Sequence, residues 1–270
     1  MIREIIDFHT HPYETMGEYS CMYKDSFYLN REEAEAELRS VGITHICGSV
    51  IEGGMKREAW EEDGFSYIQK LNDRALEIAE HYNGYCTPGF HVHPDYVKES
   101  CDEIERMYKK GVQLIGELVP YMHGWKDYSS RNFAEILDVA EQYHMILSYH
   151  TVEEEADQMA QMIAEHKKLI FVAAHPGQRV GYEKHIERIT RYENAYLDLS
   201  GTGLFRYGML CHGVKKLGSE RILFGTDFPI TNPGMYVQVV LYEHITDKDR
   251  ENIFSKNARR LLSLPEYTMT

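Results

Sequence analysis

Cysteine is scarce in this sequence, and long apolar runs are missing from it. The 270 residues include five cysteines, which are widely spaced and form no Cys-x-x-Cys pair: Cys21, Cys47, Cys86, Cys101 and Cys211. This usage argues against a disulfide framework or a zinc ribbon and indicates reduced thiols in the cytoplasm. No segment reaches the ~20 consecutive apolar residues of a membrane span. A strand-like pattern starts within the first residues, so we expect no signal peptide.

Positive charge is also in short supply. The chain has 29 Lys and Arg residues against 43 Asp and Glu residues, which gives a net charge of −14. Such a surface repels phosphate backbones and anionic lipids, so nucleic acid and membranes are poor candidate partners. Hydrophobic residues make up 43% of the chain and charged residues 27%, as in ordinary globular proteins. We therefore expect a small-molecule substrate, and self-association into a homo-oligomer stays open.

Eight short β-rich segments alternate with segments of helical periodicity. The predicted strands span residues 4–8, 43–49, 85–90, 112–118, 145–149, 169–174, 195–199 and 221–225. Several helix starts show a capping residue and, three positions later, an acidic one: Asn30 with Glu33, Thr151 with Glu154, and Thr246 with Asp249. An open doubly wound sheet rarely needs eight evenly spaced units. The pattern therefore predicts a (β/α)₈ barrel of the TIM type, with residues 1–270 as one domain.

Polar side chains gather where the predicted strands end. The strand-to-helix connections are long, notably residues 9–29, 50–64 and 119–130, and in a barrel they all lie at the C-terminal face, where active sites form. The strand ends carry a mixed set of nitrogen and oxygen donors: His9 and His11, Glu117, His150, His175 and Asp227. The pattern predicts an active site at this face.

Two of these donors are suited to hold one ion. Side chains two apart on a strand point the same way, so His9 and His11 both face the barrel axis and can bind the same metal. The histidines and carboxylates at the other strand ends complete an inward ring. This set suits Zn²⁺ first and Mn²⁺ as an alternative, whereas the lack of thiolates argues against an iron–sulfur cluster or a structural zinc.

The full set of motifs resembles the amidohydrolase superfamily, and within it the amidohydrolase-2 branch of metal-dependent hydrolases and decarboxylases. The resemblance extends over nearly the whole chain. It rests on His9-Thr10-His11-Pro12, His150, His175-Pro176-Gly177, the run from Asn194 to Gly201, Phe224-Gly225-Thr226-Asp227-Phe228-Pro229, and the closing Asn257-Ala258-Arg259-Arg260-Leu261-Leu262.

The resemblance implies roles for the donors. His9, His11 and Asp227 would bind one metal. In single-metal members of the branch, the counterpart of His150 joins that site, and the counterpart of His175 stays unligated as a catalytic histidine. Two-metal members add a bridging group at strand four, which here would be Glu117, and both histidines then hold the second ion. One or two ions per chain are thus expected.

These roles imply hydrolysis as the first interpretation. A divalent ion activates water at neutral pH and polarises a carbonyl, and Asp227 is placed to take the proton of the water and pass it to the leaving group. A small lactone, amide or ester would be the substrate. The alternative is non-oxidative decarboxylation of a small unsaturated or aromatic acid, which Glu117 disfavours. A phosphoesterase or deoxyribonuclease ranks third, and a non-catalytic metal-binding protein last.

Further residues near the strand ends are candidates for substrate contacts. His93 is interpreted as lining the pocket, whereas His91 in the same His-x-His motif is interpreted as structural. His123, on the long fourth loop, and Arg179, after strand six, complete the predicted substrate-binding set. Tyr121 on the same loop as His123 is a weaker candidate.

Overall fold

The computed structural model describes residues 3–16, 27–51, 63–152 and 156–265. Their strands form one eight-stranded parallel sheet in sequential order. The strands are β1 (Ile6–Thr10), β2 (His45–Gly48), β3 (Cys86–Phe90), β4 (Leu114–Leu118), β5 (Ile146–His150), β6 (Ile170–Ala174), β7 (Ala195–Asp198) and β8 (Ile222–Leu223). All eight predicted strands are confirmed.

The sheet closes on itself between β1 and the segment after β8. Phe8 donates its backbone N–H to the carbonyl of Phe224 over 2.8 Å, and Asp227 donates to the carbonyl of His9 over 2.8 Å. β8 itself is shorter than the predicted residues 221–225, and the residues that follow it pair with β1 across the seam. The (β/α)₈ barrel is therefore confirmed, and its closure brings Asp227 beside His9.

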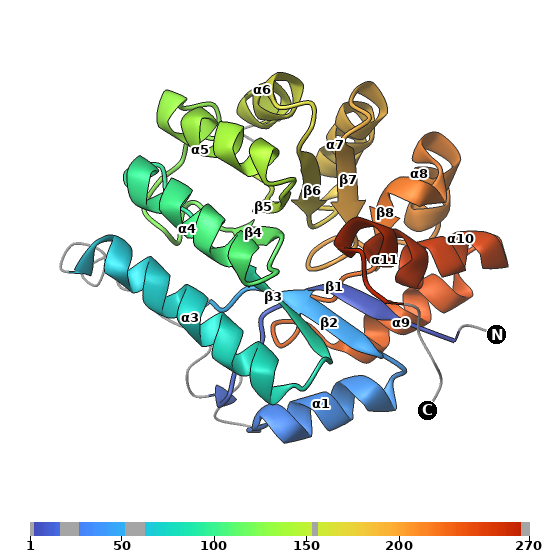
Figure 1. The fold of residues 1–270 in the computed structure, drawn as a ribbon. Coiled ribbons are helices and arrows are strands. Elements are labelled where there is room, and N and C mark those ends of the chain that lie inside the picture. Colours follow the sequence, from blue (N-terminus) through green and yellow to red (C-terminus); the bar gives the residue numbers. More distant parts are fainter. Residues whose placement is uncertain (1–2, 17–26, 52–62, 153–155, 266–270) are drawn as a thin grey trace.

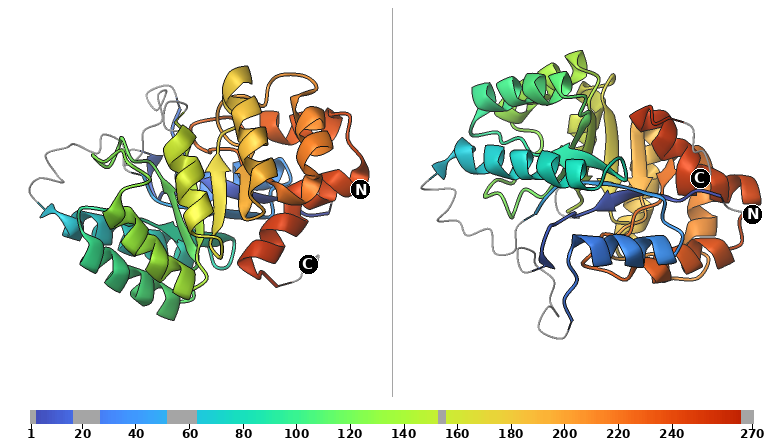
Figure 2. Two further views of the ribbon diagram at one scale, coloured as in Figure 1. Left: turned by 90° about the horizontal axis from the view of Figure 1, so that it is seen from above. Right: turned by 60° about the horizontal axis from the view of Figure 1, so that its bottom comes forward.

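Helices surround the strands in chain order, as Figure 1 shows by the progression from blue to orange. They are α1 (Arg31–Ser40), α3 (Phe65–His81), α4 (Val97–Lys109), α5 (Arg131–Gln142), α6 (Ala156–Glu165), α7 (Arg179–Arg191) and α8 (Met209–Leu217). After β8 follow α9 (Pro233–Tyr242), α10 (Asp247–Glu251), the π-helical turn η4 (Asn252–Lys256) and α11 (Asn257–Leu262). The turned views of Figure 2 show the same ring of helices around the sheet.

Two of the three predicted helix starts are confirmed. Asn30 and Thr246 each form a capping box with the acidic residue three positions later. The third pair includes Glu154, which lies outside the described residues, and α6 is described from Ala156 onwards. In the described part of the chain, no helix combines the length and apolarity that crossing a bilayer would take.

The apolar core has two parts, because successive strand residues face opposite ways. Ile115, Leu147 and Phe171 belong to a large buried cluster with the inner faces of the surrounding helices. Their neighbours Leu114, Ile146 and Val172 belong to a smaller cluster with Ala258 and Leu262 of α11. The smaller cluster occupies the N-terminal part of the strands, so the polar residues at their C-terminal ends sit on a rigid apolar base.

Candidate metal centre and active site

The first two predicted ligands, His9 and His11, project from the end of β1 into the barrel. They are 2% and 1% exposed, and their Nε2 atoms lie 3.4 Å apart. Nδ1 of His11 lies 3.1 Å from the carbonyl oxygen of Ser49, and Nδ1 of His9 lies 2.9 Å from a carboxylate oxygen of Asp198. Because both partners are acceptors, each Nδ1 carries the proton and donates it, which leaves both Nε2 lone pairs facing one space.

Glu117, at the end of β4, reaches from one pair of histidines to another. Its Oε2 lies 3.3 Å from Nε2 of His9 and 3.5 Å from Nε2 of His11. Its Oε1 lies 2.9 Å from Nδ1 of His150 and 3.2 Å from Nε2 of His175. Each carboxylate oxygen therefore serves a different pair, which is the arrangement required of a group that bridges two cations.

Asp227 completes the side of the site formed by β1. Its Oδ1 lies 3.2 Å from Nε2 of His11 and 3.7 Å from Nε2 of His9. This oxygen is buried, and no hydrogen-bond donor satisfies it within the described part of the chain. Asp227 and His175 both adopt left-handed backbone conformations, with φ of 66° and 68°. Such conformations are uncommon for residues other than glycine and are concentrated at functional sites.

The donor atoms fit a metal ion. Two groups have ligand atoms within 4.8 Å of one another, namely His9 with His11 and Asp227, and His9 with Glu117 and His175. Zinc bonds of about 2.1 Å in tetrahedral geometry separate ligands by about 3.4 Å, which matches the separations above. A buried carboxylate oxygen without a donor also requires a cation nearby. His150 belongs to neither group, although its Nδ1 contacts Glu117.

The charges at the site are strongly coupled. Burial alone would raise the pKa of Glu117, but the facing His9 and His175 hold it well below its usual range. Burial opposes protonation of His11, yet the adjacent carboxylates of Asp227 and Glu117 raise its pKa to about 9. Burial also opposes protonation of His9, but Asp198 and Glu117 raise its pKa well above the usual value. The three carboxylates of Glu117, Asp227 and Asp198 thus stabilise positive charge at the centre of the site.

Three supporting residues were not identified from the sequence as single positions. Asp198 ends β7 and Ser200 follows it; both are fully buried and contact the site histidines. Asp7 accepts hydrogen bonds from the backbone N–H and the hydroxyl of Thr226, the residue before Asp227. The sequence spacing could have indicated them. Asp7 lies two residues before His9 on β1, and Asp198 lies two residues before Ser200, so each pair shares a face of its strand.

A cavity of about 480 Å³ opens above the donors. One side consists of the polar groups His11, Glu117, His150, His175 and Asp227, together with Thr202 and Thr231. The other is largely apolar, with Ile51, Val119, Tyr121, Met122, Phe205 and Ile230. Tyr121 packs edge-on against His150, with ring centroids 5.2 Å apart. This volume suits a small molecule with an apolar body and a polar reacting end.

The three predicted substrate-binding residues lie outside the lining of this cavity. His93 is 3% exposed, and its Nε2 lies 2.8 Å from the carbonyl of His123. His123 is buried against His91, with ring centroids 4.7 Å apart. Arg179 is exposed in the first turn of α7. Their role in substrate binding stays a prediction. His91 donates from Nε2 to the carbonyl of Val50 over 2.9 Å, as a structural histidine would.

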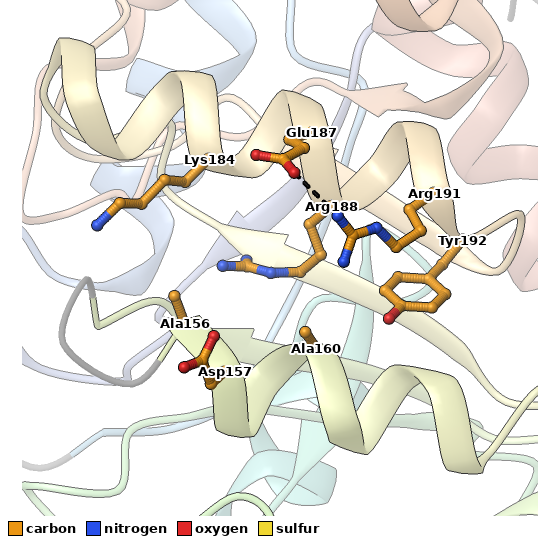
Figure 3. Close-up of a pocket in the computed structure, with 8 residues that line it drawn as sticks. All are labelled: Ala156, Asp157, Ala160, Lys184, Glu187, Arg188, Arg191 and Tyr192. Atoms are coloured by element: carbon orange, nitrogen blue, oxygen red, sulfur yellow. Dashed lines mark hydrogen bonds and ion pairs between the residues drawn. The ribbon is translucent and has the colours of Figure 1, made fainter.

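A second cleft lies between α6 and α7 (Figure 3). Lys184, Arg188 and Arg191 of α7 line it together with Asp157 of α6, and Arg191 pairs with Glu187 over 2.9 Å. Its walls come from two helices that surround the barrel, and none of the predicted metal ligands lines it. The predicted metal ligands lie at the strand ends instead.

Comparisons with known proteins agree with this architecture. The amidohydrolase family model matches residues 6–264. A TIM-barrel protein from Bordetella bronchiseptica superposes with a TM-score of 0.76 and 17% identity, covering 96% of this chain and 98% of that one. 2,6-Dihydroxybenzoate decarboxylase from Rhizobium superposes with a TM-score of 0.71 and 16% identity, covering 97% of this chain and 98% of that one. A dihydroxybenzoic acid decarboxylase from Polaromonas sp. JS666, with bound manganese and 2-nitroresorcinol, superposes with a TM-score of 0.68 and 15% identity, covering 97% of this chain and 96% of that one. No curated protein matches the chain.

Proposed function

The chain belongs to the amidohydrolase family, and we propose that it is a metal-dependent hydrolase of a small lactone, amide or ester. The observation that carries this proposal is the position of Glu117, whose two oxygens face two different pairs of histidines. A carboxylate between two sets of donors fits two cations, and paired cations favour hydrolysis. The apolar wall of the cavity supports a small organic substrate.

We propose that a divalent ion occupies the donors of His9, His11 and Asp227, and that a second ion lies between Glu117, His150 and His175. Zn²⁺ suits the nitrogen-rich donor set, and Mn²⁺ is the alternative, which the manganese in the Polaromonas decarboxylase supports. When bound, such ions supply Lewis-acid activation of water and of the scissile carbonyl.

The residues of this chain provide the proton transfers and the orientation. Oδ1 of Asp227 has no hydrogen-bond donor among the described residues, so it is available to take a proton from the attacking water and return it to the leaving group. His175, which also lines the cavity, is the second candidate for this role. Tyr121 and Phe205 would exclude water from the apolar part of the substrate. Substrate contacts by His93, His123 and Arg179 would need a substrate that extends beyond the cavity.

A second function is supported by the structural neighbours. Two of the similar structures described above are decarboxylases of dihydroxybenzoates. Non-oxidative decarboxylation of a small aromatic or unsaturated acid is therefore the alternative, and the same cavity would accommodate such an acid. Glu117 argues against it, because the reaction needs one ion to hold the acid and does not require a bridging carboxylate.

Metal analysis with activity assays tests the proposal. Removal of metal with a chelator should abolish turnover of a lactone, amide or ester panel, and Zn²⁺ or Mn²⁺ should restore it. Full activity in protein shown to be free of metal would refute metal-dependent hydrolysis. Two ions per chain with hydrolysis support the first function, whereas one ion with release of CO₂ from an aromatic acid panel supports the second.

A further inference from the structure

We propose that Asp198 and Ser200 form one positioning unit that holds His9 and His175 with protonated Nδ1 atoms, so that both Nε2 lone pairs face the metal centre. This inference rests on the proposed metal-dependent function, but it concerns metal binding alone. Neither residue lines the cavity, and neither is among the predicted ligands.

The unit is rigid and fully enclosed. Asp198 is the last residue of β7, and Ser200 follows two positions later; both are 0% exposed. The backbone N–H of Ser200 donates to Oδ1 of Asp198 over 2.9 Å, and the Ser200 hydroxyl donates to the same oxygen. These two hydrogen bonds fix the position of the hydroxyl relative to the end of β7.

One hydroxyl oxygen reaches both histidines. Oγ of Ser200 lies 3.0 Å from Nδ1 of His9 and 3.0 Å from Nδ1 of His175. Oδ2 of Asp198 lies 2.9 Å from Nδ1 of His9, and Oδ1 lies 3.4 Å from the backbone nitrogen of His175. The two histidines stand at the ends of β1 and β6, so the unit at the end of β7 joins two separate strands.

The number of protons decides the tautomers. A hydroxyl has a single proton, and the one on Ser200 is donated to the Asp198 carboxylate. The carboxylate accepts from the Ser200 backbone and hydroxyl at Oδ1, and its Oδ2 lies 2.9 Å from Nδ1 of His9. Oγ of Ser200 must therefore accept from the imidazoles, which requires a proton on Nδ1 of each. Nε2 of His9 and Nε2 of His175 are then the atoms that bind a cation.

The surrounding backbone packs closely against the unit. A side chain at Gly201 would overlap Nδ1 of His175. A Cβ at Gly225 would lie 2.9 Å from Cβ of His9 and 3.3 Å from Cβ of Ser200. The ring of His175 therefore packs directly on Gly201, and the side chains of His9 and Ser200 pack on Gly225. Removal of the hydroxyl leaves both Nδ1–H groups with fewer acceptors.

Partners that orient a metal-bound histidine usually contribute 10–100-fold in metal affinity. Ser200→Ala and Asp198→Asn should therefore each weaken Zn²⁺ binding by about 10–100-fold in competition with a chromophoric chelator. Ser200→Thr, which keeps the hydroxyl, should restore part of the loss. Ser148→Ala is the matched control, since Ser148 is a buried serine in the middle of β5, and it should bind Zn²⁺ like the wild type.

A spectroscopic measurement separates positioning from packing. In Zn²⁺-loaded protein labelled with ¹⁵N-histidine, the Nδ1–H protons of His9 and His175 should be visible and protected from exchange. Ser200→Ala should expose the proton of His175 in particular, because Ser200 is its only side-chain acceptor among the described contacts. The inference is overturned if both variants bind Zn²⁺ with wild-type affinity, if the Nδ1–H signals are unchanged, or if Ser148→Ala loses as much affinity. The chelator and product assays test the proposed hydrolase function, whereas Zn²⁺ affinity and the Nδ1–H signals test the positioning unit. The two proposals can therefore be refuted separately.

Discussion

Oε1 of Glu117 lies 3.2 Å from Nε2 of His175, across the barrel mouth from the histidines of β1. The other oxygen, Oε2, faces the Nε2 atoms of His9 and His11. One buried carboxylate therefore contacts donors from three strands. Its position decides how many cations the centre can hold.

Glu117→Gln should lower the metal content from near two ions per chain to near one, because a neutral amide is a poor bridge between dications. Inductively coupled plasma mass spectrometry of purified protein measures this directly. Glu103→Gln is the control: Glu103 is equally buried but pairs with Arg106 at α4, so its metal content should be unchanged. Two ions retained in Glu117→Gln would rule out the bridging role.

Asp227→Asn should keep most of the metal and lose about 10²–10⁴-fold in turnover, the usual contribution of a positioned general base. Asparagine keeps one oxygen donor and the shape of the side chain, but it cannot accept the proton. The measurement is turnover per bound ion. If Asp227→Asn turns over like the wild type with metal bound, Asp227 is a ligand only and the base must be sought at His175.

Gly201→Ala should impair metal binding and turnover, because the new Cβ would overlap Nδ1 of His175 and displace the ring. Gly201 has φ of 59°, so part of any loss would come from backbone strain. Gly177→Ala isolates that part, since Gly177 has φ of 72° and nothing within 4 Å of the new Cβ. Gly201→Ala should lose at least as much thermal stability as Gly177→Ala, because it adds the overlap to the strain, but only Gly201→Ala should lose Zn²⁺ affinity. If the two variants bind Zn²⁺ with equal affinity, steric overlap with His175 does not explain the loss.

Much of this architecture is readable in the sequence, for physical reasons. The period of two along β1 places His9 and His11 on one face, and the eight alternating strand and helix segments predict the barrel. The position of a donor at a strand end then predicts where it lies, because barrel geometry brings all strand ends together. Contacts such as that of Ser200 with His9 join residues 191 positions apart. No local pattern encodes them, since they depend on the packing of side chains after closure.

The cavity was the least predictable part. Tyr121 was weighed as a substrate contact and lines it, whereas Phe205 and Ile230 were not singled out. His123 directly follows the lining residues Tyr121 and Met122 but is itself buried, and His93 is buried in a loop that contributes no lining residue. Loop conformation decides such differences, and loops follow turn geometry and packing that hydrophobic periodicity does not report.

The last prediction concerns acid stability and a residue outside the site. His185 of α7 is 5% exposed, and Nη1 of Arg188 donates to its Nδ1 over 3.1 Å. Burial and the adjacent Arg188 charge lower the pKa of His185 from 6.5 to about 3. Below about pH 6.5, His185 therefore binds a proton in the unfolded chain but stays neutral in the folded chain. The stability from neutral His185 is complete above pH 6.5 and falls as the pH drops toward 3.

His185→Asn should remove that dependence, because asparagine keeps an acceptor for Arg188 near the position of Nδ1 and does not titrate. Between pH 6 and pH 4 the unfolding free energy of the wild type should fall more steeply than that of the variant, by up to about 1.4 kcal/mol per pH unit. Urea unfolding at intervals of half a pH unit measures both slopes. His9 and His11, whose pKa values are shifted upward, are present in both proteins and cancel in the difference. Parallel curves would mean that His185 accepts a proton in the folded protein, and the low pKa assigned to it would be wrong.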